Sequence, residues 1–358
     1  MRHSASALLF AFLTLPLPGQ DTVAQVKTEI ERLQQSIKEH PLRSVELSEA
    51  VSAVNQDLKS AAAAADAGRI YVALEGLGRA MDLLEGLRKV TEKEQAMKGG
   101  LPAFESELDK TKTRLADLRR PSGSSAVLRI PAAIQALAET AQGQSVPLLE
   151  GGRGFAVATG PRDGLFYLGQ AEGEAEFARF CTGLRSSESK RRAELRSVLP
   201  ELNGLQVKTN IAFRPPLSID LHPRFIALNS TLKLAQELDG AGFYAGALFK
   251  YLDAVRHYAM IDAKPLDSDA KERLKLDLAA ARRKLDSSSQ DESIAQLFLE
   301  RAEMQLSAPA PSEDEWRSVR VTLDRVLPAY FSALQPPTSQ PQVSGKTVDI
   351  TLVRWPYT

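Results

Sequence analysis

Asp253 and His257 form the clearest acid–base pair in this chain. They stand four residues apart, so a helix would place both on one face, where the carboxylate could orient the imidazole for general-base chemistry. The same pair could supply two metal ligands, but further ligands do not follow at a recognisable spacing. We therefore expect no metal site and no cofactor. A hydrolase with a dispersed carboxylate and histidine site is kept as the alternative to a non-enzymatic function.

A glycine-rich run at residues 151–154 is the second place where chemistry could occur. A loop that cradles phosphate needs a strand before it and a helix after it. Here residues 146–150 have a helical pattern, and no Lys-Ser or Lys-Thr pair follows the glycines. We expect a turn between helices or a loosely packed helix at this run. Scattered carboxylates near 151–162 stay a possible location for the alternative hydrolase site.

The composition limits the classes of function further. The chain has 358 residues, of which 43% are hydrophobic and 25% are charged, so it can bury a sizeable core in about two or three packing units. Its 45 basic side chains are balanced by 45 acidic ones, whereas a nucleic-acid binder needs a surplus of Lys and Arg. One cysteine and four histidines exclude a disulfide scaffold. We expect no nucleic-acid partner.

Residues 1–20 have the pattern of a secretory signal peptide. A short basic start is followed by the apolar run 7–18 and then by polar residues, with cleavage after position 19, 20 or 24. The run is shorter than the roughly 20 apolar residues that cross a bilayer. The pattern predicts a secreted or periplasmic protein whose mature chain has no stable membrane span.

The rest of the chain predicts a mostly α fold, built from antiparallel helical hairpins. Apolar residues recur at steps of three and four, which is typical of amphipathic helices. We expect a four-helix unit over 21–120, a helical domain over 126–306, and a linker, helix and terminal strand over 307–358. Within the second unit the pattern predicts short helices over 131–140, 146–159 and 164–172, and a longer helix over 174–199.

A minor β element is predicted where the period changes. Apolar and polar residues alternate over 205–213 until two prolines follow, and they alternate again over 348–352. Residues 126–130 are a weaker third candidate. Because an isolated strand leaves its backbone groups unpaired, we expect these segments to pair in a small sheet.

Two stretches match each other at equal offsets, one beginning at Ala65 and the other at Asp239. In each, a glycine precedes a helix on which two alanines stand a helical period apart, as close helix crossing requires. The second stretch resembles a tetratricopeptide repeat through Leu234, Ala235, Leu238, Gly242, Tyr244, Ala247, Tyr251 and Ala254. The family's usual proline is missing from both copies, and the copies do not follow one another directly.

That resemblance implies a helical groove that binds a peptide or a partner protein. On the family's pattern, Asn229, Gln236 and Asp239 would point into the groove, although each could equally be an ordinary exposed residue of an amphipathic helix. We expect an exported, non-enzymatic interaction or scaffold protein with a protein or peptide partner in the envelope. A purely structural envelope component is a third possibility.

Overall fold

The computed structural model describes residues 22–39, 48–118, 130–184, 190–192, 194–214 and 219–335. Across these ranges helices dominate, so the predicted mostly α fold is confirmed. The predicted signal peptide and the strand predicted at 348–352 lie outside the described residues, as do residues 126–129 of the third strand candidate. Within the described ranges, no helix is both long enough and apolar enough to cross a bilayer.

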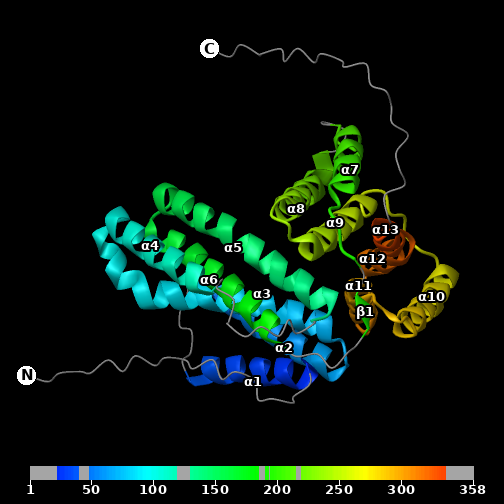
Figure 1. The fold of residues 1–358 in the computed structure, drawn as a ribbon, viewed down its shortest axis with the longest axis horizontal. Coiled ribbons are helices and arrows are strands. Elements are labelled where there is room, and N and C mark those ends of the chain that lie inside the picture. The colour runs from blue at the N-terminus through cyan, green and yellow to red at the C-terminus, as the bar shows by residue number, and fades with distance from the viewer. Residues whose placement is uncertain are drawn as a thin grey trace, which may run out of the picture.

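The N-terminal helices form an elongated layer that occupies the left and lower part of Figure 1. Their bounds are α1 Thr22–Glu39, α2 Ser48–Asp66, α3 Ile70–Lys93, the 3-10 helix η1 Glu94–Gly99, and α4 Leu101–Leu118. The turn between α2 and α3 places Gly68 at a φ of 74°, a backbone conformation that glycine adopts without strain. The helical hairpin predicted from the first of the two matching stretches is therefore present.

Helices α5 (Ala132–Ala158) and α6 (Pro161–Gly183) differ from the prediction. Residues 132–158 form one continuous helix that includes Pro147, so the predicted break at 141–145 is wrong. The helix predicted over 174–199 is also wrong, because α6 starts at Pro161 and ends at Gly183. The two helices pack along each other over their length, and α6 also packs along α3 of the first predicted unit.

Glycines on α6 explain how closely it lies against α3. A Cβ atom at Gly173 would lie 2.7 Å from the carbonyl oxygen of Met81 and 2.8 Å from the Cα of Asp82, both in the α3 backbone. A Cβ at Gly169 would likewise meet the backbone of Glu85. The two helices therefore approach at backbone distance, as close-packed small residues allow.

The C-terminal helices gather at the other end of the molecule, at the right in Figure 1. Their bounds are α7 Leu199–Ala212, η2 Ile219–Leu221, α8 His222–Gly240, α9 Tyr244–Ala259, α10 Ser268–Asp286, α11 Ser293–Leu306, α12 Glu313–Val321 and α13 Leu327–Ala333. A π-helical turn, η3 Thr322–Val326, joins α12 to α13. The capping box of Ser312 and Glu315 at the start of α12 is present.

The strand predicted at 205–213 is wrong, because residues 205–212 belong to α7 and Phe213 is the residue that ends this helix. Leu202, Leu205 and Thr209 are buried at helical spacing, whereas Val207 and Ile211 are 58% and 60% exposed. Apolar residues on two opposite faces of one helix thus produced the alternating pattern. Pro200 in the first helical turn is compatible with this assignment, since that position needs no N–H donor.

Within the described ranges, the β structure is one short parallel pair. β1 (Arg191–Arg192) pairs with β2 (Gln290–Asp291) and ties the segment after α6 to the start of α11. The α8–α9 hairpin turns at Gly242, whose φ is 79°. The hairpin geometry agrees with many kinds of helical protein, so the tetratricopeptide resemblance stays a prediction.

Candidate functional site

Two adjoining cavities form a groove at the C-terminal end of the molecule. The larger has a volume of about 750 Å³ and lies between α7, α9, α12 and the π turn. The smaller has a volume of about 420 Å³ and lies between α7, α8 and the end of α9. They share Lys208, Tyr258 and Asp262 in their lining. We call their combined lining the α7–α9–α12 groove.

Helix α9 supplies the floor of the groove. Tyr251, Val255, Tyr258 and Ala259 follow at steps of four, three and one, which places them on one stripe of the helix. Burial, together with the neighbouring carboxylate of Glu201, raises the pKa of Tyr251 above its ordinary value. The Tyr251 phenol therefore stays protonated at neutral pH and can donate a hydrogen bond. The floor is apolar and carries phenol hydroxyls.

The π turn forms part of one wall of the groove, and a nearby proline explains why the helix adopts it. Pro328 has no N–H with which to continue the helical ladder, and its ring crowds the preceding turn. The N–H of Leu327 instead reaches back five residues to the carbonyl of Thr322. The extra residue shifts the phase of the helix, so that Arg325 and Ala329 join Arg317 and Arg320 in lining the groove. Such π turns are frequent at functional sites.

The charges that line the groove are only partly neutralised by neighbouring side chains. The guanidinium of Arg317 lies 3.2 Å from Asp314, and that of Arg320 lies 3.6 Å from Asp324. Within the described ranges, no carboxylate lies within ion-pair distance of Lys208, Lys264 or Arg325. These three cations are exposed. Together the six basic side chains of the lining outnumber its three acidic ones: Lys208, Arg214, Lys264, Arg317, Arg320 and Arg325 against Glu201, Asp262 and Asp324.

The residues predicted to bind a ligand lie on α8, outside this groove. Asp239 is buried and accepts hydrogen bonds from the Ser197 hydroxyl (2.8 Å) and the Val198 N–H (2.7 Å). It therefore secures the start of α7 rather than facing an open surface. Asn229 is exposed and accepts a hydrogen bond from Gln206 of α7 at 3.3 Å, and Gln236 is half-buried. The α8 face that we predicted to be a groove thus carries contacts to α7.

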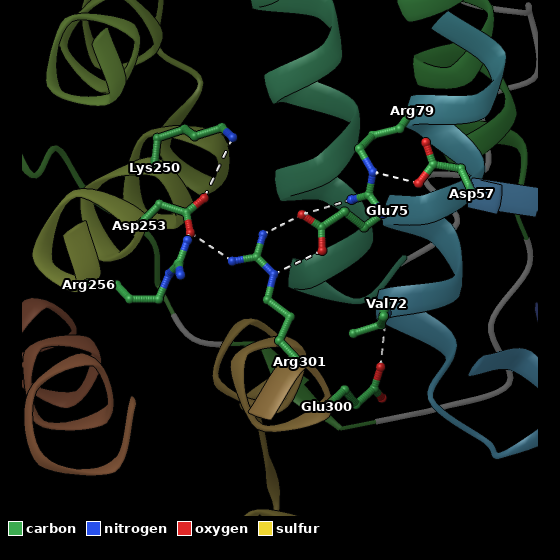
Figure 2. Close-up of polar contacts among 9 residues, drawn as sticks. All are labelled: Asp57, Val72, Glu75, Arg79, Lys250, Asp253, Arg256, Glu300 and Arg301. Atoms are coloured by element: carbon green, nitrogen blue, oxygen red, sulfur yellow. Dashed lines mark hydrogen bonds and ion pairs between the residues drawn. The ribbon is translucent and has the colours of Figure 1, made fainter. Parts of the chain in front are cut away.

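The proposed acid–base pair is also engaged elsewhere. Figure 2 shows Asp253 of α9 facing Arg301 of α11, whose Nη1 donates to the carboxylate at 2.7 Å. Lys250 and Arg256 lie 3.6 and 3.7 Å from the same carboxylate. Burial lowers the pKa of His257, and the positive charge of Arg256 lowers it further. Asp253 is a counter-ion of three cations and does not orient His257.

Arg301 is the centre of a buried ionic network that joins the two ends of the molecule. Its Nε also donates to Glu75 of α3 at 2.9 Å, and the guanidinium lies 5.0 and 4.9 Å from the ring centres of Phe249 and Phe298. Burial alone would raise the pKa values of Glu75 and Asp253, but the charge of Arg301 holds both below their ordinary values. In Figure 2 the network continues through Arg79 to α2. These compensated charges indicate a structural role.

Glu300, next to Arg301, secures the start of α3. Its carboxylate accepts hydrogen bonds from the backbone N–H groups of Tyr71 (2.9 Å) and Val72 (3.0 Å) in the first turn of the helix. Burial raises its pKa to about 7, although these two bonds and Arg282 act in the opposite direction. The first turn of α3 thus depends on a residue more than 200 positions away in the sequence.

Carboxyls with raised pKa values predict a pH-dependent stability. Burial raises the pKa of Asp82 to about 7, and burial together with Asp82 raises that of Glu174 to about 8. Each group binds its proton more tightly in the folded chain, so the free energy of unfolding should fall as the pH rises from about 4.5 to about 8. Denaturant titrations at pH 5 and 8 should show this loss, and Glu174→Gln should reduce it. The control is Glu150→Gln, at an exposed position, which should leave the loss of stability between pH 5 and pH 8 unchanged. If Glu174→Gln also leaves this loss unchanged, the raised pKa assigned to Glu174 is wrong.

The glycine-rich run lies inside α5 and does not form a phosphate loop. A Cβ at Gly164 of α6 would come within 2.6 Å of the carbonyl of Gly152, so the run provides close packing between these helices. The expected turn falls just after it, at Gly160, whose φ is 130°. Among the described residues, no group of three or more His, Cys, Asp or Glu is arranged to hold a metal ion.

Several residues that line the groove have other roles in the sequence-based prediction. Ile211 falls in the strand predicted at 205–213, and Tyr251 falls in the stretch that resembles a tetratricopeptide repeat. Arg317 to Arg325 belonged to a separate C-terminal unit in the predicted division. Once α7 is recognised as a helix, its exposed apolar face is the feature that indicates a binding surface. Comparisons with protein-family models, curated proteins and solved structures find no match to this chain.

Proposed function

We propose that this chain is an exported, non-enzymatic interaction or scaffold protein that binds a peptide or a protein partner in the α7–α9–α12 groove. The observation that supports this most is the combination of an apolar floor with exposed apolar and cationic side chains on the walls. Ile211 of α7, which lines the smaller cavity, is 60% exposed. Val207, one turn before it on the same helix, is 58% exposed but lies outside the lining. Exposed apolar residues beside a concave surface are typical of protein-binding sites.

The hydrolase alternative receives less support from the geometry. A nucleophile or general base must be free to approach its substrate, whereas Asp253 is held by Arg301, Lys250 and Arg256. The carboxylates that line the groove are similarly engaged in part, with Asp324 facing Arg320 and Glu201 facing Arg196 at 2.5 Å. Export of the protein rests on the signal-peptide pattern of residues 1–20.

Site-specific photo-crosslinking tests this proposal. A photoreactive amino acid replaces Ile211, which lines the groove, and in a matched control it replaces Leu276 on α10, which is 70% exposed but lies outside the groove. We expect irradiation in the producing cells to give a discrete adduct only at position 211, and mass spectrometry to identify its partner. Identical adducts at both positions, or none at position 211, would refute the proposal.

A further inference from the structure

We propose that the α7–α9–α12 groove selects an acidic segment of its partner, with carboxylates that alternate with aliphatic or aromatic side chains. This inference rests on the proposed function and specifies its ligand. Three exposed cations of the lining have no carboxylate within ion-pair distance in the described ranges: Lys208, Lys264 and Arg325. Charge complementarity favours a partner that brings the missing negative charges.

The positions of the cations fit a ligand that lies along the groove. Lys208 belongs to α7, Arg325 to the π turn and Lys264 to the segment that follows α9, and α9 packs against both α7 and the π turn. The apolar stripe of α9 lines the same cavity. A segment in this groove could therefore direct carboxylates to these cations while its apolar side chains cover the floor.

The apolar floor also separates an acidic peptide from a simple polyanion. Val255 and Ala259 offer no hydrogen-bond donor to a phosphate or sulfate, and burying them needs apolar groups on the ligand. Tyr251 and Tyr258 present a flat ring together with a hydroxyl, a combination that is enriched at protein interfaces. A ligand with both carboxylates and apolar side chains satisfies both parts of the lining.

Fluorescence anisotropy with defined peptides tests the inference. The probe is a short labelled peptide of Glu, Leu and Phe, and the two comparison peptides replace Glu by Lys or replace Leu and Phe by Ser. We expect the first peptide alone to bind, and its Kd to rise when the salt concentration goes from about 0.1 M to about 1 M. If the Ser peptide binds as tightly as the probe, or if polyphosphate displaces the probe, the groove binds polyanions in general and the inference is overturned.

A charge-reversal pair locates the binding. Lys264→Glu with Arg325→Glu should raise the Kd of the acidic peptide about tenfold or more, because two attractions become repulsions. Lys59→Glu with Lys233→Glu changes the net charge equally at exposed positions outside the groove and should leave the Kd unchanged. Circular dichroism and the Tm confirm that each variant is folded. An equal effect of both pairs would overturn the inference.

The two proposals fail in distinguishable ways. If position 211 gives a specific adduct while the acidic peptide does not bind, the partner-binding function stands and the ligand class proposed here is wrong. If the acidic peptide binds in the groove while position 211 gives no adduct in cells, the site stands and the proposed cellular function is wrong.

Discussion

Replacing Arg301 by Met is expected to lower the free energy of unfolding by about 3–5 kcal/mol, the range measured when one partner of a buried ion pair is removed. Arg301 is 18% exposed, and its loss would leave Glu75 and Asp253 facing each other without their shared counter-ion. Lys250 and Arg256 would compensate Asp253 only in part, since they lie 3.6 and 3.7 Å away. Urea denaturation at pH 7 measures the effect.

Two comparison variants separate the charge from the packing of this side chain. Arg153→Met removes an exposed ion pair with Glu105 and should cost less than about 1 kcal/mol. Combining Arg301→Met with Glu75→Gln and Asp253→Asn removes the uncompensated charges and should recover part of the loss. A cost for Arg301→Met as small as that of Arg153→Met would contradict the assigned role of the network.

Gly173→Ala is expected to destabilise the chain by about 1–3 kcal/mol or more, although alanine is the better helix former. The new Cβ would lie 2.7 Å from the carbonyl oxygen of Met81 and 2.8 Å from the Cα of Asp82. Both atoms belong to the backbone of α3, so relief requires the two helices to separate. The change in Tm and in the urea midpoint measures this cost.

Gly151→Ala is the matched control for this prediction. Gly151 is also a helical glycine, but a Cβ at this position would have no atom within 4 Å. Alanine should therefore stabilise the chain by up to about 1 kcal/mol through its higher helix propensity. A loss of stability in Gly173→Ala together with a gain in Gly151→Ala would support backbone contact between α3 and α6. A change of stability in the same direction for both substitutions would contradict it.

Local patterns predicted the mostly α class correctly because helix formation leaves a periodic signature in the sequence. The apolar stripes of α1, α3 and α9 and the capping box at Ser312 depend on residues within a few positions of one another. The sequence alone therefore established the mostly α class and the α8–α9 hairpin. The balance of 45 basic and 45 acidic side chains was equally a property of composition.

Only the tertiary structure decided that residues 205–212 form a helix and not a strand, and where the groove lies. An alternating run fits a half-buried strand, and it also fits a helix with apolar residues on two faces, as Leu205 and Val207 show. Burial of Leu205 in the hydrophobic core, on the helix α7 that packs against α8, selects the helix, and that burial is not encoded in the spacing.

Long-range contacts likewise decided the roles of the charged residues. Asp253 pairs with Arg301 rather than with His257, and Asp239 accepts a hydrogen bond from the Val198 N–H at the start of α7. The sequence specified which side chains could form hydrogen bonds and ion pairs. Which partners they met depended on how the helices pack, because electrostatic and hydrogen-bond energies are set by distance and burial, neither of which is a property of a local pattern.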